Sequence, residues 1–420
     1  MCRGCVVLFA CLAFVVASPA MALTVTVDSA GGGDFTSIQD GIDGVSFGDT
    51  VLVMPGEYVE CIAMGPSANG VSLLGAAAAE STIISMPDGA IIEPLLKLEG
   101  VGSSTCISRL TLTTVRGSAS RPAIACYDSD ALITGNIIRD SLGGCHMAPC
   151  AGGMHVYSGS PQVVGNTFSD NQSADGGAMH IEGGSPLVHG NLFVRNVGWG
   201  FGGTNSGGAI CIWNGNPVIT ENTFRDNEAS RGGAIYSDGW FVRIERNIFD
   251  HNWAESTGAA AYVDCAEGVV FADNAIIGNT DYNIGCCVLG VSAGSQTGTG
   301  SFERNVFWGN DTGGEPSIEL YGERLSESVF RHNFFGDDST CLVAAPECAG
   351  AGTLNFADNW WGTTEESEIA ARVLDVDDDP DLCRILYSPW CGDPSCAGSA
   401  TTVPEAIQEI SWGRLKSIYR

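Results

Sequence analysis

The chain has 420 residues, 56 of them Gly, and only 16% are charged; 49 Asp and Glu outnumber 19 Lys and Arg to give a formal net charge of -30. This composition excludes a coiled coil and a highly charged disordered chain. An acidic surface repels phosphate backbones and anionic lipid headgroups, so nucleic acid and membrane surfaces are excluded as partners. Polyuronic acids are repelled too unless a bound cation bridges the two, which keeps calcium as a candidate cofactor.

The N-terminus has the pattern of an export signal. Arg3 precedes an apolar run over 6–16, and Ala20-Met21-Ala22 gives a small-x-small cleavage pattern. The alternative is a membrane anchor, but the run is too short to span a bilayer. We therefore predict a signal peptide over 1–22, no transmembrane segment, and a secreted or cell-surface monomer that begins near Leu23.

Most of the remaining chain is a repeat. Nine Asn residues recur at intervals of 25 to 31, each followed two positions later by Phe, Ile or Trp: Asn136, Asn166, Asn191, Asn222, Asn247, Asn274, Asn305, Asn333 and Asn359. Such a period indicates a solenoid, and alternation such as that in 179–182 is typical of strands. We expect about ten to twelve coils of three short strands each, with the Asn supplying the left-handed turn residues and bonding from coil to coil.

Both ends of the repeat region resemble a known family. The segment DFTSIQDGIDGVSFGDTVLVMPGEYVE (34–60) is similar to the start of pectin-lyase-like domains, and NWWGTT (359–364) with YSPW (387–390) is similar to their end. The resemblance implies an all-β, right-handed parallel β-helix over 23–397, with a short N-terminal capping helix. The superfamily includes lyases, glycosidases, epimerases and adhesins, so it fixes no activity. The chain has only two Lys, Lys97 and Lys416, which argues against pectate-lyase chemistry.

Candidate functional residues lie on the strands that follow the Gly-Gly pairs. Counting back from each ladder Asn places two rows of side chains on the outer face, because alternate residues of a strand point outward. We predict Glu182, Asp238, His180 and Asp264 as catalytic residues, since carboxylates and imidazoles transfer protons. We predict aromatic and imidazole rings that stack on sugars or contact them at His155, Tyr157, Trp213, Tyr236 and Tyr262.

These residues leave two functions open. In the first, the protein binds and cleaves an extracellular polysaccharide, with Glu182 and Asp238 as an inverting carboxyl pair two coils apart. In the second, it is a non-catalytic adhesive solenoid that recognises a glycan or protein, because outward aromatic residues also stabilise any sheet by stacking across strands. A row at Asp140, Asp170 and Asp226 is a candidate calcium site, although Asp at turns more often bonds to the local backbone.

The cysteines and the C-terminus complete the prediction. After loss of the signal, 14 of 17 Cys remain, an even count that favours disulfides in an exported protein. The short spacings predict loop bridges at 145/150, 341/348 and 391/396. Residues 398–420 depart from the repeat, and Thr402 with Glu405 forms a capping box, so this tail is either a capping helix or a sorting signal.

Overall fold

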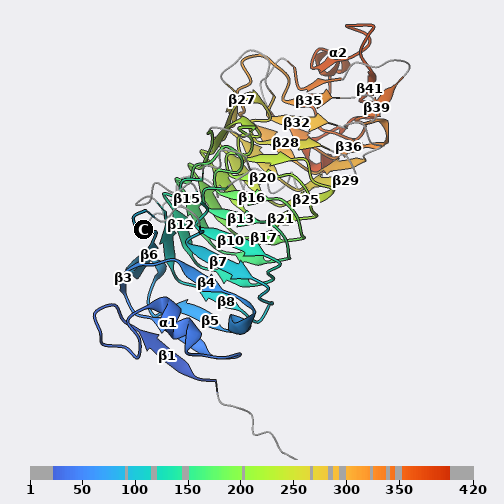
Figure 1. Ribbon diagram of the computed structural model, residues 1–420. Helices are drawn as coiled ribbons and strands as arrows, with labels where there is room; N and C mark the ends of the chain where they lie inside the picture. Colours follow the sequence, from blue (N-terminus) through green and yellow to red (C-terminus); the bar gives the residue numbers. More distant parts are fainter. Residues whose placement is uncertain are drawn as a thin grey trace, which may run out of the picture.

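The protein is a parallel β solenoid of about eleven coils (Figure 1). The computed structural model describes residues 22–89, 93–114, 121–143, 151–200, 204–264, 268–281, 287–292, 299–321, 325–336, 341–345 and 352–397. Every paired strand lies parallel to the equivalent strand one coil away. The predicted right-handed parallel β-helix is therefore confirmed, with the hand that parallel crossovers take.

Each coil contributes one strand to each of three long sheets. Sheet A contains β1 (Thr24–Val27), β2 (Thr50–Val53), β5 (Ser72–Gly75), β8 (Cys106–Ser108), β11 (Leu132–Thr134), β14 (Gln162–Val164), β17 (Leu187–His189), β21 (Val218–Thr220), β25 (Phe241–Glu245), β29 (Gly268–Ala272), β33 (Gly300–Glu303), β36 (Val329–Arg331), β39 (Thr353–Asn355) and β41 (Arg384–Leu386). Sheet B contains β3 (Gly56–Val59), β6 (Thr82–Ser85), β9 (Thr111–Thr113), β12 (Ile137–Arg139), β15 (Thr167–Ser169), β18 (Leu192–Val194), β22 (Thr223–Arg225), β26 (Ile248–Asp250), β30 (Ala275–Ile277), β34 (Val306–Trp308) and β37 (Phe334–Phe335).

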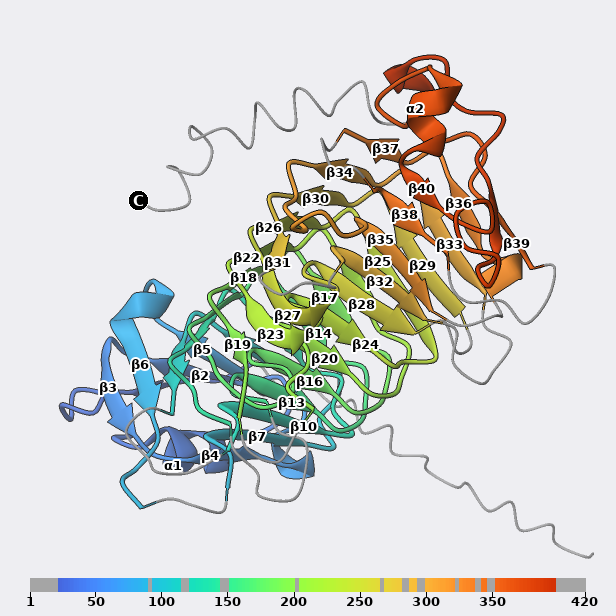
Figure 2. The ribbon, with the colours of Figure 1, turned by 90° about the horizontal axis from the view of Figure 1, so that it is seen from above.

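Sheet C follows sheet B in each coil, and a small sheet D lies at the corner between them (Figure 2). Sheet C contains β4 (Ile62–Met64), β7 (Leu96–Glu99), β10 (Ile124–Tyr127), β13 (Met154–Val156), β16 (Met179–Ile181), β20 (Ile210–Ile212), β24 (Ile235–Ser237), β28 (Ala261–Asp264), β32 (Leu289–Ser292), β35 (Ile318–Tyr321), β38 (Val343–Ala344) and β40 (Val373–Leu374). Sheet D contains β19 (Val197–Gly198), β23 (Glu228–Arg231), β27 (Trp253–Thr257) and β31 (Thr280–Asp281).

Buried Asn side chains hold the turn between sheets A and B. The Nδ2 of Asn222 donates to Oδ1 of Asn247 at 3.0 Å and to the carbonyl oxygen of Val188 at 2.9 Å, and the backbone N–H of Asn222 donates to the same Oδ1 at 2.9 Å. The same Asn-to-Asn bonds join all eight consecutive pairs of the nine ladder residues, from Asn136 to Asn359, which accepts at the end of the row. Each amide therefore satisfies backbone groups that the turn would otherwise bury unpaired.

One detail of the turn prediction is wrong. The left-handed residue is not the ladder Asn but the residue before it, as at Gly190 (φ 63°), Glu221 (φ 57°) and Arg246 (φ 55°). The preceding residue makes the sharp bend with its side chain in solvent, which leaves the Asn amide directed into the stack. Gly fits such positions best because it has no Cβ.

The core is a continuous stack of apolar side chains inside the coils. Phe224 is fully buried and lies between Phe193 and Phe249, at ring-centroid distances of 4.9 and 5.1 Å. The strand pairing places these residues directly above one another, with Phe168 and Ile276 at either end of this part of the row. The predicted aromatic row is therefore confirmed.

Short helices flank the solenoid. Helix α1 (Ile38–Asp43) buries Ile38 and Ile42 and begins at Ser37, whose hydroxyl accepts a hydrogen bond from the backbone N–H of Asp40. Its role as a cap stays a prediction. Helix α2 (Glu366–Ala370) lies near the other end, and four 3-10 turns are η1 (Pro66–Ala68), η2 (Ala79–Ser81), η3 (Leu325–Glu327) and η4 (Pro394–Ala397). Within the described ranges no helix is long and apolar enough to cross a bilayer.

The predicted terminal segments lie almost wholly outside the described residues. This applies to the signal peptide, of which only residue 22 is described, and to the tail over 398–420. The boundaries of the 23–397 domain accordingly stay predictions.

The disulfide prediction needs correction. Cys341 is a thiol, so the bridge 341/348 is wrong, and five other described cysteines are also thiols: Cys61, Cys106, Cys126, Cys211 and Cys287. The stacking explains one of them, since the neighbours of Cys126 in adjacent coils are Leu98 and Val156, which offer no sulfur. The 145/150 loop lies outside the described residues. Cys391 is disulfide-bonded, and its pairing with Cys396 stays a prediction.

Phe224→Ala tests the stacked core. We expect it to lower the free energy of unfolding by about 3–5 kcal/mol, because the neighbouring coils are fixed by their backbone bonds and cannot collapse into the cavity. Denaturant unfolding followed by circular dichroism measures the change. Phe47→Ala is the control, because Phe47 is 69% exposed and its loss should change stability by about 0.5 kcal/mol or less. Equal effects of the two substitutions would contradict the packed stack.

Candidate functional site

The outer face of sheet C carries the two predicted rows in register. His155, His180, Cys211, Tyr236 and Tyr262 pair directly from β13 to β28. The second row follows each strand by one residue: Tyr157, Glu182, Trp213, Asp238 and Asp264, with Asp264 as the last residue of β28. Neighbouring coils are about 4.8 Å apart, so the rows form a continuous strip across five coils.

Two imidazoles lie beneath the surface of this strip. His155 and His180 are both fully buried although their strands face outward, and neither ring nitrogen of either residue has a hydrogen-bond partner. The two rings meet edge to face at 4.8 Å, and His180 meets Trp213 edge to face at 5.2 Å. Burial lowers the pKa of His155, and burial together with the charge of His155 sets the pKa of His180 well below its usual value. Both imidazoles are therefore neutral at pH 7.

Glu182 contacts one of these two imidazoles. Its Oε2 lies 3.3 Å from Nε2 of His155, a short electrostatic contact that does not meet the geometry of a hydrogen bond. The Glu182 side chain remains 41% exposed. The contact with His155 lowers the pKa of Glu182, while partial burial opposes it. Glu182 is consequently an ionised carboxylate with access to solvent.

Asp238, two coils further along, has the opposite electrostatics. Partial burial and the adjacent carboxylate of Asp264 raise its pKa, and Arg231 opposes that shift. Asp264 occupies the next coil in the same row, so the two carboxyl groups repel when both are ionised. Asp238 therefore keeps its proton to a higher pH than an ordinary Asp.

The aromatic side chains of the strip stack mainly on one another. Tyr157 has Tyr127 on one face, at 4.4 Å, and His155 on the other, at 3.6 Å. Tyr236 lies between Tyr262, at 5.4 Å, and the guanidinium of Arg231, at 5.0 Å. The ring faces of Tyr157 and Tyr236 are thus already covered. Their ring edges and hydroxyl groups are left for other contacts, and sugar binding at these two residues stays a prediction.

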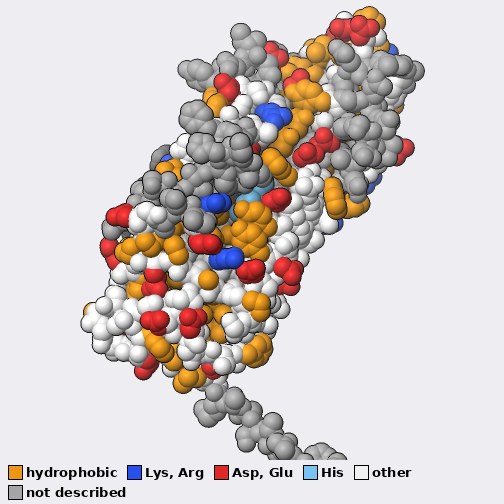
Figure 3. All heavy atoms as spheres, viewed as in Figure 1, with side chains coloured by type: hydrophobic (Ala, Val, Ile, Leu, Met, Phe, Trp, Pro, Cys, Tyr) orange, Lys and Arg blue, Asp and Glu red, His pale blue; other side chains and the backbone are white. Residues whose placement is uncertain are grey.

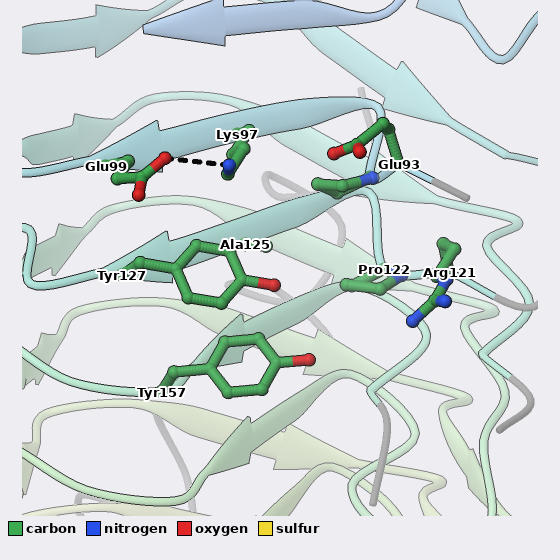
Figure 4. Close-up of a pocket in the computed structure, with 9 residues that line it drawn as sticks. Glu93, Lys97, Glu99, Arg121, Pro122, Ala125, Tyr127 and Tyr157 are labelled. Atoms are coloured by element: carbon green, nitrogen blue, oxygen red, sulfur yellow. Dashed lines mark ion pairs between the residues drawn. The ribbon is translucent and has the colours of Figure 1, made fainter. Parts of the chain in front are cut away.

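Sheet C also holds a cavity of about 330 Å³ beside Tyr157 (Figure 4). In the close-up, the hydroxyls of Tyr127 and Tyr157 and the side chain of Arg121 point into it from β10 and β13 and the segment before β10. Lys97 of β7 forms an ion pair with Glu99 at 2.7 Å and lies 5.5 Å from the Tyr127 ring centre. The cavity is lined by Glu93, Pro94, Lys97, Glu99, Arg121, Pro122, Ala125, Tyr127 and Tyr157.

Of these nine residues the sequence analysis predicted Tyr157 and missed the other eight. Counting back from Asn136 in the same way gives Tyr127 and Ala125, so the signal for Tyr127 was present. Lys97, Glu99 and Arg121 gave no such signal, because no ladder Asn follows the coil of Lys97 and Arg121 precedes its strand.

The row considered for calcium is a row of left-handed turn residues. Asp170 (φ 56°), Arg195 (φ 53°) and Asp226 (φ 53°) each precede an Asn of a second ladder, formed by Asn171, Asn196 and Asn227. Arg195 donates two hydrogen bonds to the carboxylate of Asp170, at 2.8 and 2.7 Å. Over the described residues there is no group of three or more His, Cys, Asp or Glu arranged to hold a metal.

A family model and several solved structures are similar to this chain. Residues 99–259 match the model of the right handed beta helix region. A pectin methylesterase from carrot has 11% identity and a TM-score of 0.32, with 95% of this chain and 98% of that chain covered. A PL6 family polysaccharide lyase from Pseudopedobacter saltans has 10% identity and a TM-score of 0.44, with 90% and 94% covered. No curated protein sequence matches. At these values no activity transfers to this chain.

The buried imidazoles predict how stability depends on pH. Their pKa values are lowered in the folded protein, so the unfolded chain binds protons that the folded chain does not as the pH falls below about 6.5, the ordinary His value. The free energy of unfolding should therefore fall between pH 7.5 and pH 5. His180→Phe should lose less stability over this range than the wild type, measured by urea unfolding at both pH values. His332→Phe, on a turn of the opposite side, should match the wild type; equal pH dependence in all three proteins would contradict the buried neutral pair.

Proposed function

We propose that this chain, a right-handed β-helix of the pectin-lyase-like superfamily, binds an extracellular polysaccharide along the outer face of sheet C and hydrolyses it there. The observation that carries the proposal is the strand register, which places the carboxyl groups of Glu182 and Asp238 in one outward row two coils apart. The directions of their pKa shifts support it. His155 lowers the pKa of Glu182, whereas burial and Asp264 raise that of Asp238. Environments that move the pKa values of two neighbouring carboxyl groups apart are typical of acid and base partners in catalysis.

We assign a role to each carboxyl group from the direction in which its pKa is displaced. Asp238, whose pKa is raised, acts in its protonated form and donates that proton to the glycosidic oxygen as the bond to the anomeric carbon breaks. Glu182, which is ionised, accepts a proton from the water that attacks this carbon from the other side. Water and substrate thus supply all the atoms of the products, and the two carboxyl groups exchange their protonation states.

The spacing favours inversion. Glu182 and Asp238 are two coils apart in one row, so their backbones are about 10 Å apart. Glu182 contacts His155 on one side of Trp213, and Asp238 is coupled to Asp264 on the other. A separation of about 6.5–9.5 Å between carboxyl groups leaves room for the attacking water of an inverting glycosidase. Trp213, half-buried between them, is the remaining candidate for contact with a sugar ring.

The second candidate function is recognition without catalysis. The observation that favours it is the mutual stacking of the tyrosines, since covered ring faces stabilise the sheet and contribute less to sugar binding. Such a face is suited to an adhesive solenoid that contacts a glycan or protein through hydroxyl groups and charges.

Charge-removing substitutions test the hydrolase. The purified protein is first screened on a glycan panel with detection of products. Glu182→Gln and Asp238→Asn keep the side-chain shape, and each should reduce kcat/KM by at least about a hundredfold on any glycan that the wild type degrades. Glu221→Gln is the matched control, since Glu221 pairs with Arg246 at an exposed turn away from sheet C. Wild-type rates in both site variants would show that Glu182 and Asp238 are not the catalytic pair. A wild type that degrades no glycan would favour the adhesive function.

The rate should also depend on pH in a way that Asp264 controls. A general acid works only while protonated, so the raised pKa of Asp238 extends activity toward higher pH. Removing the Asp264 charge with Asp264→Asn lowers the pKa of Asp238, and the alkaline limb of the kcat/KM profile should move to lower pH. The acid limb, which follows Glu182, should stay in place. An unchanged alkaline limb would exclude Asp238 as the acid.

A further inference from the structure

The coils just before the strip place two cations on sheet C of a strongly acidic protein, together with two carboxylates, Glu93 and Glu99. Lys97 is one of only two Lys residues in the chain, and it shares the cavity on sheet C with Arg121. The charge of Lys97 is balanced by Glu99 at 2.7 Å. Arg121 has no ion-pair partner among the residues that the structure describes, and the residue is half-buried at the cavity wall. Figure 3 shows basic and acidic side chains beside an apolar patch on this face.

The groups around Arg121 are suited to an oxyanion. A guanidinium presents planar donors that match carboxylate and sulfate oxygens. The hydroxyls of Tyr127 and Tyr157 point into the same space and are donors too (Figure 4). Their rings are fixed by stacking at 4.4 Å, so little freedom is lost when a ligand binds. Glu93, also on the wall, disfavours a ligand with several adjacent negative charges.

The strip itself is acidic. From the coil of Tyr157 onward its described residues carry Glu182, Asp238, Asp264 and, further along the first row, Glu319, with Arg231 as the cation described beside them. A polyanion laid along the whole strip would meet these carboxylates without enough cations to balance them. A glycan with isolated anionic groups can place one of them at Arg121 and lay uncharged sugars along the acidic strip.

We infer that the cavity beside Arg121 binds an oxyanion substituent, carboxylate or sulfate, on a sugar of an otherwise uncharged polysaccharide. The inference rests on the proposed function, because it takes the strip as the glycan site. Tyr127 and Trp213 are three coils apart, so the anionic sugar lies about 14 Å from the bond between Glu182 and Asp238. The cavity thereby selects a sparsely charged polysaccharide. It also determines which glycosidic bond of that polysaccharide lies between Glu182 and Asp238.

Matched pairs of polysaccharides test the inference by calorimetry. One pair is glucuronoxylan and its carboxyl-reduced form, and the other is carrageenan and its desulfated form. The wild type should bind the charged member of at least one pair about tenfold more tightly than its neutral partner, the amount expected for one charge-assisted contact. The pair that shows the preference identifies the oxyanion. Polygalacturonate, which is charged on every sugar, should bind more weakly than the preferred member.

Variants separate the cavity from the rest of the strip. Arg121→Gln should abolish the preference while binding of the neutral glycans stays unchanged. Arg243→Gln, which removes an exposed arginine of sheet A, should keep it. Circular dichroism and melting temperature check that both variants fold.

Each outcome distinguishes the two proposals. Equal affinity within both pairs, or a preference that survives in Arg121→Gln, overturns the oxyanion site. If the wild type prefers the charged glycan but Glu182→Gln keeps the full rate, the proposed hydrolase is overturned. The oxyanion site then stands without it. Absence of binding to every glycan overturns both.

Discussion

The structure depends on one constraint, which is that every coil must pair with the next in a fixed register. Parallel backbone bonds alone allow neighbouring strands to slip, and a slip of one residue turns every side chain to the opposite face. The buried Asn side chains prevent this. The amide of Asn222 bonds both to Asn247 and to the carbonyl oxygen of Val188, so a shifted coil leaves several buried polar groups unpaired. The inward Phe stack has the same period and favours the same register.

A fixed register sets the distances between side chains on the outer face of sheet C. Residues at equivalent positions are about 4.8 Å apart per coil whatever their identity. The chain can therefore place like charges next to one another, as at Asp238 and Asp264, and hold them there against repulsion. It can also hold two imidazoles in a dry environment beside Glu182. The Asn ladder stabilises the fold, and this stability offsets the repulsion between the carboxylates of Asp238 and Asp264 on the outer face.

The sequence predicted the fold and the rows well because both follow from local periodicity. Counting back from the Asn of each repeat placed His180 and Tyr236 in one row, and the strand pairing confirms it. The burial of His180 could not be predicted, since exposure depends on what covers a face and not on which way a strand residue points. Ring stacking was missed for a related reason, because alternation gives the direction of Tyr157 but not its neighbours. Arg121 precedes its strand, where the period carries no information. The roles of the predicted site residues stay proposals.

The spacing of the Asn ladder has a consequence for how such a molecule changes over evolutionary time. Consecutive ladder residues such as Asn191 and Asn222 are structurally equivalent, and each makes the same bonds to the coil on either side. A gene duplication or deletion that spans one whole repeat would join a coil to a neighbour that it already fits. The solenoid therefore lengthens or shortens in whole coils, and each step moves the cavity and the carboxyl pair relative to each other by one fixed increment.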